Sequence, residues 1–226
     1  MKSVAFLLLL AALPLQADLA SEIRAAEGWT GYAVPLTEGR HSFCSWEVER
    51  VTSTMLVLLR VSKGEIETIR LSSPECPAKH DVRWLRDVDP HESVRFLRML
   101  IDTDRSVAKK AVTALALHDD AEEELLWLAR RHRSADVRGA ALFWVGQRAG
   151  RRAAETLRDA IDHDPEAEVK AKAVFGIAQM PDDHSVPILI ELLSHRSREV
   201  RRKAAFWLSQ KNDPRALAAF EEILRR

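Results

Sequence analysis

The C-terminal two-thirds of the chain contain four copies of a unit of about thirty residues. Each copy aligns on one valine, with alanine four positions later and Leu, Val or Ile eight positions later. The windows are VAKKAVTALAL from Val107, VRGAALFWVGQ from Val137, VKAKAVFGIAQ from Val169 and VRRKAAFWLSQ from Val200. Self-similarity at this period is typical of stacked repeat proteins, so the repeats predict a binding scaffold and leave open what it binds.

From Pro90 onward the spacing of apolar residues predicts helices. A first helix over residues 90–100 is followed by long B helices that begin near the four valines and alternate with A helices. Asp104, Ser134, Asp164 and Ser197 stand where helix N-caps are expected. The A helices are expected at about 122–131, 153–162, 186–193 and 215–226.

The first seventeen residues resemble a secretory signal. Lys2 supplies the charge, residues 4–13 form the apolar run, and residues 15–17 make a tolerable cleavage site. The apolar run is too short to span a bilayer. We therefore expect a signal peptide over 1–17, no membrane span, and an exported protein, periplasmic or secreted, that begins near Asp18.

Export would also decide the state of the two cysteines, Cys44 and Cys76. An oxidising compartment would pair them, and closing this loop would stabilise the fold by roughly 3–4 kcal/mol. The alternative is two buried free thiols, which applies if residues 1–17 are not a signal.

The charge balance argues against a nucleic-acid partner. The chain has 34 basic and 34 acidic residues, whereas nucleic-acid binding usually needs a basic excess. Its 46% hydrophobic content is ample for a folded core.

The residue pattern of 18–89 differs from that of the repeats and predicts a small β-rich domain that caps them. Residues 28–35 are expected to be extended, and residues 55–61 and 65–71 to form a hairpin. Trp29, Trp46 and Trp84 are expected to form its core or to lie against the first helices, with a ligand cage as the alternative. The predicted fold is mainly α: an α-solenoid of about four helix pairs over 90–226, preceded by a β-rich segment that a Cys44–Cys76 disulfide pins.

Each B helix has an apolar face at positions 0, +4, +7 and +8 from its valine, which is expected to pack on the A helices. Trp144 and Trp207 lie at +7 and are expected to fill volume there. In three copies an acid precedes the valine and a base follows it: Asp136 and Arg138, Glu168 and Lys170, Glu199 and Arg201. These charges predict either a recognition strip or bonds that join neighbouring repeats and favour the first helical turn.

The pattern Asp136-Val-Arg-x-x-Ala-Ala, followed by Ala153-x-x-x-Leu157, resembles the HEAT repeat, especially the short type of phycobilisome-lyase-like proteins. The resemblance covers residues 92–226, and the first copy departs from it with Ser106 and Ala108 in place of the acid and the base. It implies a protein-binding or assembly scaffold.

A second side of each B helix carries the predicted partner site. In the last three copies, positions +3, +6 and +10 from the valine include two lysines, three phenylalanines and three glutamines in register: Lys172, Lys203, Phe143, Phe175, Phe206, Gln147, Gln179 and Gln210. If this side lines a concave surface, the rings could hold an extended protein or peptide and the amides could bond its backbone. Alternatively, the +6 rings wedge between neighbouring B helices as packing.

No catalytic residues, metal site or cofactor are predicted. Histidines lie beside acids, as in His118-Asp119-Asp120, but His132, His163 and His195 are expected about a repeat apart, which favours capping or solvated turns over one shared ion. No H-E-x-x-H, G-x-S-x-G or phosphate-binding glycine loop is present. A chromophore or small-ligand lyase and a structural spacer in the cell envelope remain the alternative functions, and the oligomeric state stays open.

Overall fold

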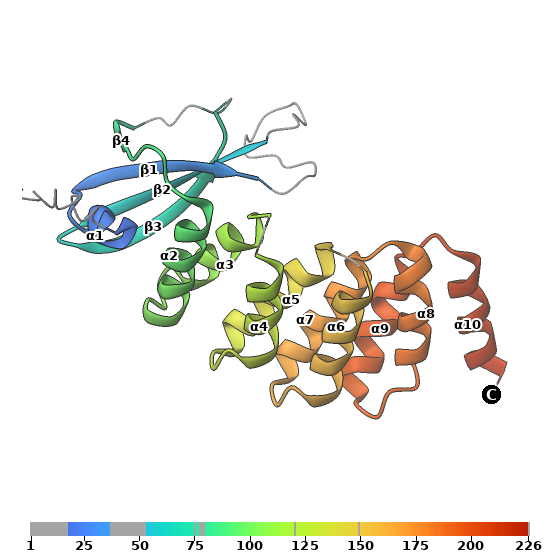
Figure 1. The fold of residues 1–226 in the computed structure, drawn as a ribbon. Helices are drawn as coiled ribbons and strands as arrows, with labels where there is room; N and C mark the ends of the chain where they lie inside the picture. Colours follow the sequence, from blue (N-terminus) through green and yellow to red (C-terminus); the bar gives the residue numbers. More distant parts are fainter. Residues whose placement is uncertain are drawn as a thin grey trace, which may run out of the picture.

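The computed structural model describes residues 18–36, 53–74, 76, 80–119, 121–148 and 150–225. Figure 1 shows a small twisted sheet at the N-terminal end of a row of paired helices. Among the described helices, none has the length and apolar character needed to cross a membrane. The predicted signal peptide over 1–17, Trp46 and Cys44 lie outside the described residues, so the signal and the Cys44–Cys76 disulfide stay predictions.

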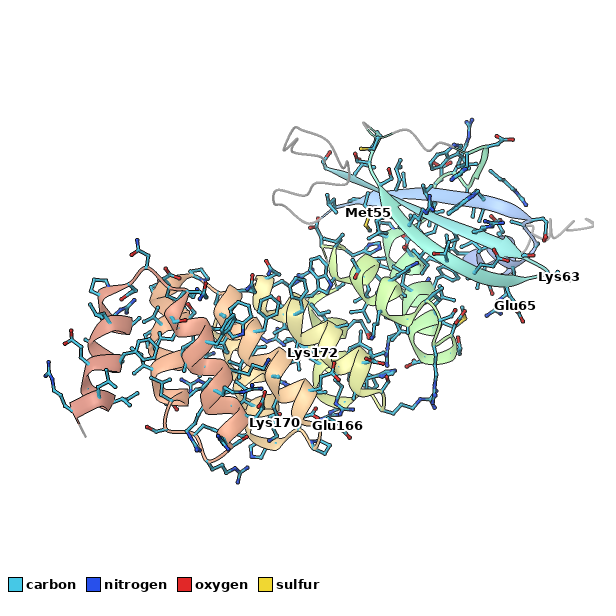
Figure 2. The ribbon with its side chains drawn as sticks, turned by 180° about the vertical axis from the view of Figure 1, so that it is seen from behind. Met55, Lys63, Glu65, Glu166, Lys170 and Lys172 are labelled. Atoms are coloured by element: carbon cyan, nitrogen blue, oxygen red, sulfur yellow. The ribbon has the colours of Figure 1, made fainter. Side chains whose placement is uncertain are left out.

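The sheet has the strand order β3-β2-β1-β4. Its strands are β1 (Gly28–Pro35), β2 (Thr54–Ser62), β3 (Glu65–Ser72) and β4 (Val82–Trp84). β2 pairs antiparallel with both β1 and β3, whereas β4 runs parallel to β1. Lys63 and Gly64 join β2 to β3 with φ angles of 53° and 79°, as a type I′ turn requires. In Figure 2 Lys63 and Glu65 mark this tip of the hairpin, and the predicted hairpin and first strand are confirmed.

One face of the sheet packs against the first helices. Tyr32, Leu59 and Ile69 point to this face and share one hydrophobic core with Phe96 and Leu97. These two residues belong to α2 (Pro90–Thr103), and the short helix α1 (Leu19–Arg24) adds Leu19 and Ile23 to the same core. The core therefore continues from the sheet into the helices without a break.

The tryptophan prediction was wrong for Trp29 and Trp84. Strand alternation sets Trp29 on the face of β1 opposite Tyr32, where it is half-buried and stacks on His80 at a centroid distance of 5.1 Å. Trp84 is 47% exposed and lies over Gly31, where a Cβ would come within 3.2 Å of its ring. Both rings thus lie on the outer face of the sheet, and aliphatic side chains and Tyr32 fill the core instead.

The remaining helices alternate between two layers. The A layer contains α2, α4 (Glu122–Arg131), α6 (Arg151–His163), α8 (Asp182–Leu192) and α10 (Pro214–Arg225), and the B layer contains α3 (Ala108–Ala116), α5 (Ala135–Arg148), α7 (Ala167–Gln179) and α9 (Arg198–Ser209). Each helix starts and ends within a few residues of its prediction. Successive B helices contact one another more closely than successive A helices do, so the B layer lines the concave side.

Candidate partner-binding surface

In three copies the base after the repeat valine binds the end of the preceding A helix. Side-chain nitrogens of Arg138, Lys170 and Arg201 donate hydrogen bonds to main-chain carbonyl groups at or just beyond the C-terminal end of that helix. The distances to the carbonyl oxygens of His132, Ile161 and His195 are 2.9, 2.9 and 2.8 Å. These bases therefore hold the A-to-B turns in place.

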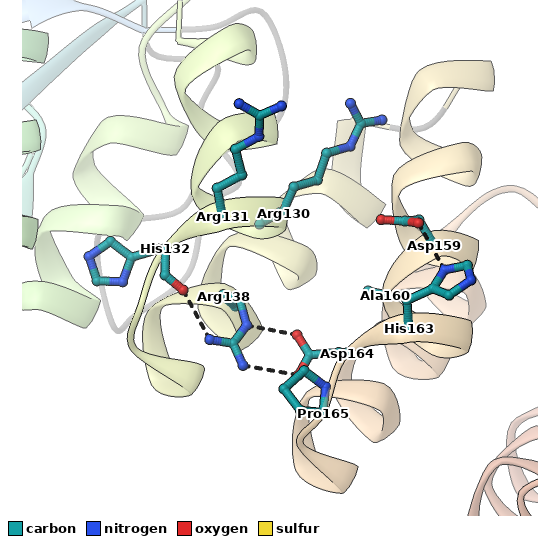
Figure 3. A pocket seen from close by; sticks show the side chains of 10 residues that line it. Arg130, Arg131, His132, Arg138, Asp159, Ala160, His163, Asp164 and Pro165 are labelled. Carbon is teal, nitrogen blue, oxygen red and sulfur yellow. Dashed lines mark hydrogen bonds and ion pairs between the residues drawn. The ribbon is translucent and has the colours of Figure 1, made fainter.

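Arg138 also joins its repeat to the next one. Its Nε and Nη2 donate to the two carboxylate oxygens of Asp164 at 2.7 and 3.0 Å, and both side chains are largely buried. Burial alone would raise the pKa of Asp164, but the hydrogen bonds from Arg138 and from the main-chain N–H of Glu166 hold that pKa below its ordinary value. Figure 3 shows the pair among the residues that line a pocket of about 280 Å³.

In the same three copies, the acid that precedes the valine is also paired. Asp136 lies 2.7 Å from Nζ of Lys109 and so links α5 to α3. Glu168 pairs with Lys172 of its own helix at 2.9 Å, and Glu199 does so with Arg202 at 2.7 Å. The interpretation as intramolecular bonds therefore fits better than a recognition strip, although only Asp136 and Arg138 join neighbouring repeats.

Two histidines act as turn residues. The Nδ1 atoms of His132 and His195 accept hydrogen bonds from the main-chain N–H of Ser134 and Ser197, both at 3.0 Å. Asp164 plays the same part in the intervening repeat by accepting from the N–H of Glu166. In the described part of the chain, no three His, Cys, Asp or Glu side chains lie together as metal ligands would.

The predicted phenylalanine row is part of a longer row of rings. We call Phe143, Trp144, Phe175, Phe206 and Trp207 the aromatic strip. Phe143 stacks on Phe175 with ring centroids 5.7 Å apart, and Phe175 packs against Trp207 at 4.7 Å. Trp144 and Phe206 add edge contacts to the strip at 5.1 and 4.9 Å. The strip thus runs across α5, α7 and α9 without interruption.

Burial of the rings changes along the strip. Phe143 and Phe175 are half-buried because each is covered by a ring of the next B helix, whereas Phe206 is 54% exposed. The structure therefore contains both predicted arrangements: packing inside the stack and an open ring at its end. Trp207, which was expected to pack on the A helices, is half-buried and takes the place in the stack that was predicted for Phe206.

A close approach of two glycines sets how α5 and α7 cross. A Cβ at Gly146 would overlap the main chain of Gly176, and a Cβ at Gly176 would lie 2.6 Å from a methyl group of Leu157. The two helices can therefore touch through their backbones. Gly146 lies at +9 from its valine, where the other copies have Ala116, Ala178 and Ser209.

The stack of helix pairs agrees with a family match. The family model of HEAT repeats matches residues 154–226, which run from α6 to the end of α10. This part of the chain consists of HEAT repeats. No curated protein matches its sequence.

The predicted glutamines and lysines lie on the B helices α5, α7 and α9 or at their C-terminal ends. Gln147, Gln179 and Gln210 are exposed, and Nε2 of Gln147 lies 3.5 Å from Oε1 of Gln179. Lys172, labelled in Figure 2, runs its aliphatic stem against Gly139, and Lys203 is half-buried on α9. The predicted site residues therefore come together on one side of the stack, where the glutamines form the most exposed row.

A buried polar cluster connects the sheet to the first helix pair, α2 and α3. The Oγ of Ser93 lies 2.9 Å from the Tyr32 hydroxyl and 3.1 Å from Nε2 of His118. All three side chains are buried, so the Ser93 and His118 pair has no access to a substrate. Burial also raises the pKa of Tyr32, which keeps its hydroxyl neutral. The sequence brought His118 to attention but not Ser93, which lies 25 residues before it, or Tyr32, which lies 61 residues before Ser93. The three residues come together only in the fold.

Proposed function

We propose that the protein is a non-catalytic interaction scaffold that binds a protein or peptide along the B-helix side of its HEAT repeats. HEAT repeats commonly serve protein–protein interaction, and stacked repeats offer extended concave surfaces for it. The observation that carries the proposal is the aromatic strip, which crosses three B helices and is partly open to solvent beside an exposed row of glutamines.

The two rows suit different parts of a bound segment. The rings supply apolar contact area that costs little side-chain entropy, and the amides of Gln147, Gln179 and Gln210 can donate to and accept from a peptide backbone. Lys172 and Lys203 border the strip and favour carboxylates in the bound segment.

The test is affinity capture with the exposed row altered. A variant carrying Gln147→Ala, Gln179→Ala and Gln210→Ala should stay as helical as the unaltered chain, because these side chains are exposed. It should capture much less of the partner from an envelope extract than the unaltered chain does. The matched control is Trp127→Ser on the A-helix side, which is also exposed. Equal capture by all three proteins would contradict the proposal.

Export and the disulfide belong to the same proposal. We expect the protein to be periplasmic or secreted, to lose residues 1–17, and to join Cys44 to Cys76. Intact mass spectrometry of the protein from a secreting host, with and without reduction, checks all three expectations. A chain that retains Met1 or carries two free thiols would contradict them.

A further inference from the structure

The pocket of Figure 3 lies between the C-terminal ends of the A helices α4 and α6 and is open to solvent. Its volume of about 280 Å³ is just below the range of sites for drug-sized molecules, which is about 300–1,000 Å³. It shares no residue with the proposed B-helix surface. The pocket can therefore hold a group about as large as one side chain, separately from that surface.

Two small residues create the pocket. Each of the A helices α2, α4, α6 and α8 has a fully buried leucine that is followed, three and four positions later, by two apolar residues. In order, the leucines are Leu97, Leu125, Leu157 and Leu189, and the pairs are Leu100-Ile101, Leu128-Ala129, Ala160-Ile161 and Leu192-Leu193. Ala129 and Ala160 are the two small residues among these pairs, and both line the pocket. They leave open a space that larger side chains would fill.

Two arginines at the end of α4 supply positive charge to the pocket. Arg130 donates a hydrogen bond from Nη2 to Oγ1 of Thr156 at 2.7 Å. Arg131 is exposed and has no hydrogen-bond or ion-pair partner within the described part of the chain. In Figure 3 both side chains point away from Arg138. Their guanidinium groups can therefore reach a ligand without breaking the bonds that join the repeats.

The acidic side chains of the pocket already have partners. Asp164 accepts two hydrogen bonds from Arg138, and Asp159 lies 3.0 Å from Nδ1 of His163. Three arginines and two aspartates line the pocket, so it carries an excess of one positive charge when its histidines are neutral. An anion with a single charge would balance this excess.

We propose that this pocket binds a small organic carboxylate, either a free molecule or the acidic side chain of a bound peptide. A guanidinium group matches the two oxygens of a carboxylate, which takes up the charge of Arg130 and Arg131. The methyl groups of Ala129 and Ala160 and the ring of Pro165 offer contact for the aliphatic part of the ligand. The site lies on the A helices and so goes beyond the proposed function of the B-helix surface.

The test is a titration of the full chain with small probes, followed by NMR of the main-chain amides and the arginine Nε–H groups. The main probe is a glutamate residue blocked at both ends, which carries one carboxylate on an aliphatic stem. Blocked glutamine is the neutral control of the same shape. We expect saturable shifts at residues 129–131 and 159–163 with blocked glutamate and none with blocked glutamine.

Two substitutions should weaken this binding for different reasons. Arg131→Gln removes a guanidinium group and should lower the affinity about tenfold, because a charge-assisted hydrogen bond is lost. Ala160→Leu introduces the residue that α2, α4 and α8 have at this point, and it should fill the pocket and remove binding without lowering the midpoint of thermal unfolding. The matched control is Arg95→Gln, an exposed residue of α2, which changes the net charge equally and should leave the affinity unchanged.

Several results would overturn the proposal. They are the absence of saturable shifts with blocked glutamate, equal shifts with blocked glutamine, undiminished binding by Ala160→Leu, and equal weakening by Arg95→Gln and Arg131→Gln. Tighter binding of inorganic phosphate than of blocked glutamate would also overturn it, because the ligand would then be a phosphate.

A short alanine peptide with one central glutamate distinguishes the two sources of the carboxylate. If the proposal holds, tighter binding of the peptide than of blocked glutamate identifies a protein partner, and equal binding identifies a free carboxylate. The triple glutamine variant should bind blocked glutamate like the unaltered chain. A failure of the B-helix proposal is therefore distinguishable from a failure of this one.

Discussion

The α5–α7 junction inside the stack and the α9–α10 pair at its end follow one sequence pattern but differ in what they leave uncovered. At the inner junction, glycine backbones touch, stacked rings cover each other, and Arg138 binds Asp164. At the end, Phe206, Leu217 and Leu224 remain exposed. The phenylalanine at the same repeat position is therefore covered at the inner junction and exposed on α9.

The largest expected difference between the two regions is in ion pairing. Arg138→Ala would leave the carboxylate of Asp164 largely buried without its partner, so we expect a loss of about 3 kcal/mol in the free energy of unfolding. Arg202→Ala on α9 removes an exposed pair that solvent screens, so it should leave the free energy of unfolding nearly unchanged. Urea unfolding measures the loss in each variant, and equal losses would contradict the expected difference between the two ion pairs.

Gly146→Ala should come next. Its Cβ would overlap the main chain of Gly176, so α5 and α7 must move apart, at a cost of about 2 kcal/mol. Ala218→Val on the exposed side of α10 adds comparable bulk and should change stability by less than about 0.5 kcal/mol. Thermal unfolding of both variants checks this, and a neutral Gly146→Ala would show that the helices do not touch as described.

A smaller effect is expected from pH at an inner turn. Burial lowers the pKa of His132 below its ordinary value of 6.5, so the folded chain binds this proton less readily than the unfolded chain. The stability that depends on neutral His132 is therefore fully present above pH 6.5 and is lost as the pH falls through the lowered pKa. His132→Asn keeps an acceptor for the Ser134 N–H and should lessen the drop in stability between about pH 7 and 5. If the drop in stability is the same in this variant, groups other than His132 cause it.

The end of the aromatic strip should contribute less to stability than its middle. Phe206→Ser should change the free energy of unfolding by less than about 1 kcal/mol, because the ring is more than half exposed. Phe175→Ser, whose ring is covered by a neighbour on each side, should cost about 2–3 kcal/mol. Chemical denaturation of both variants measures the contrast, and equal costs would place Phe206 in the packed part of the strip.

Much of the fold could be predicted because local signals agreed with it. The four valines fixed the phase of each B helix, and Lys63-Gly64 between two apolar runs predicted the hairpin. Alternation along β1 also carried a signal for its core face: Thr30, Tyr32 and Val34 lie on one face and Trp29 on the other. Assigning the tryptophans to the core by size alone overlooked that signal.

The site was less predictable because it depends on lateral contacts. Positions +6 and +7 lie about 100° apart on a helical wheel, and the wheel does not give the tilt between neighbouring helices. The close approach of α5 and α7 depends on Gly146 and Gly176. On α9 it is Trp207, at +7, that packs against Phe175. The Tyr32, Ser93 and His118 cluster joins three distant segments, so no local pattern could reveal it.

Hydrogen exchange of the full chain tests the central contrast between the sealed interior of the stack and its last two described helices. The account predicts that amides of α9 and α10 exchange faster than those of α5 and α7. Uniform exchange along the stack, or faster exchange in α5 and α7 than in α9 and α10, would contradict it.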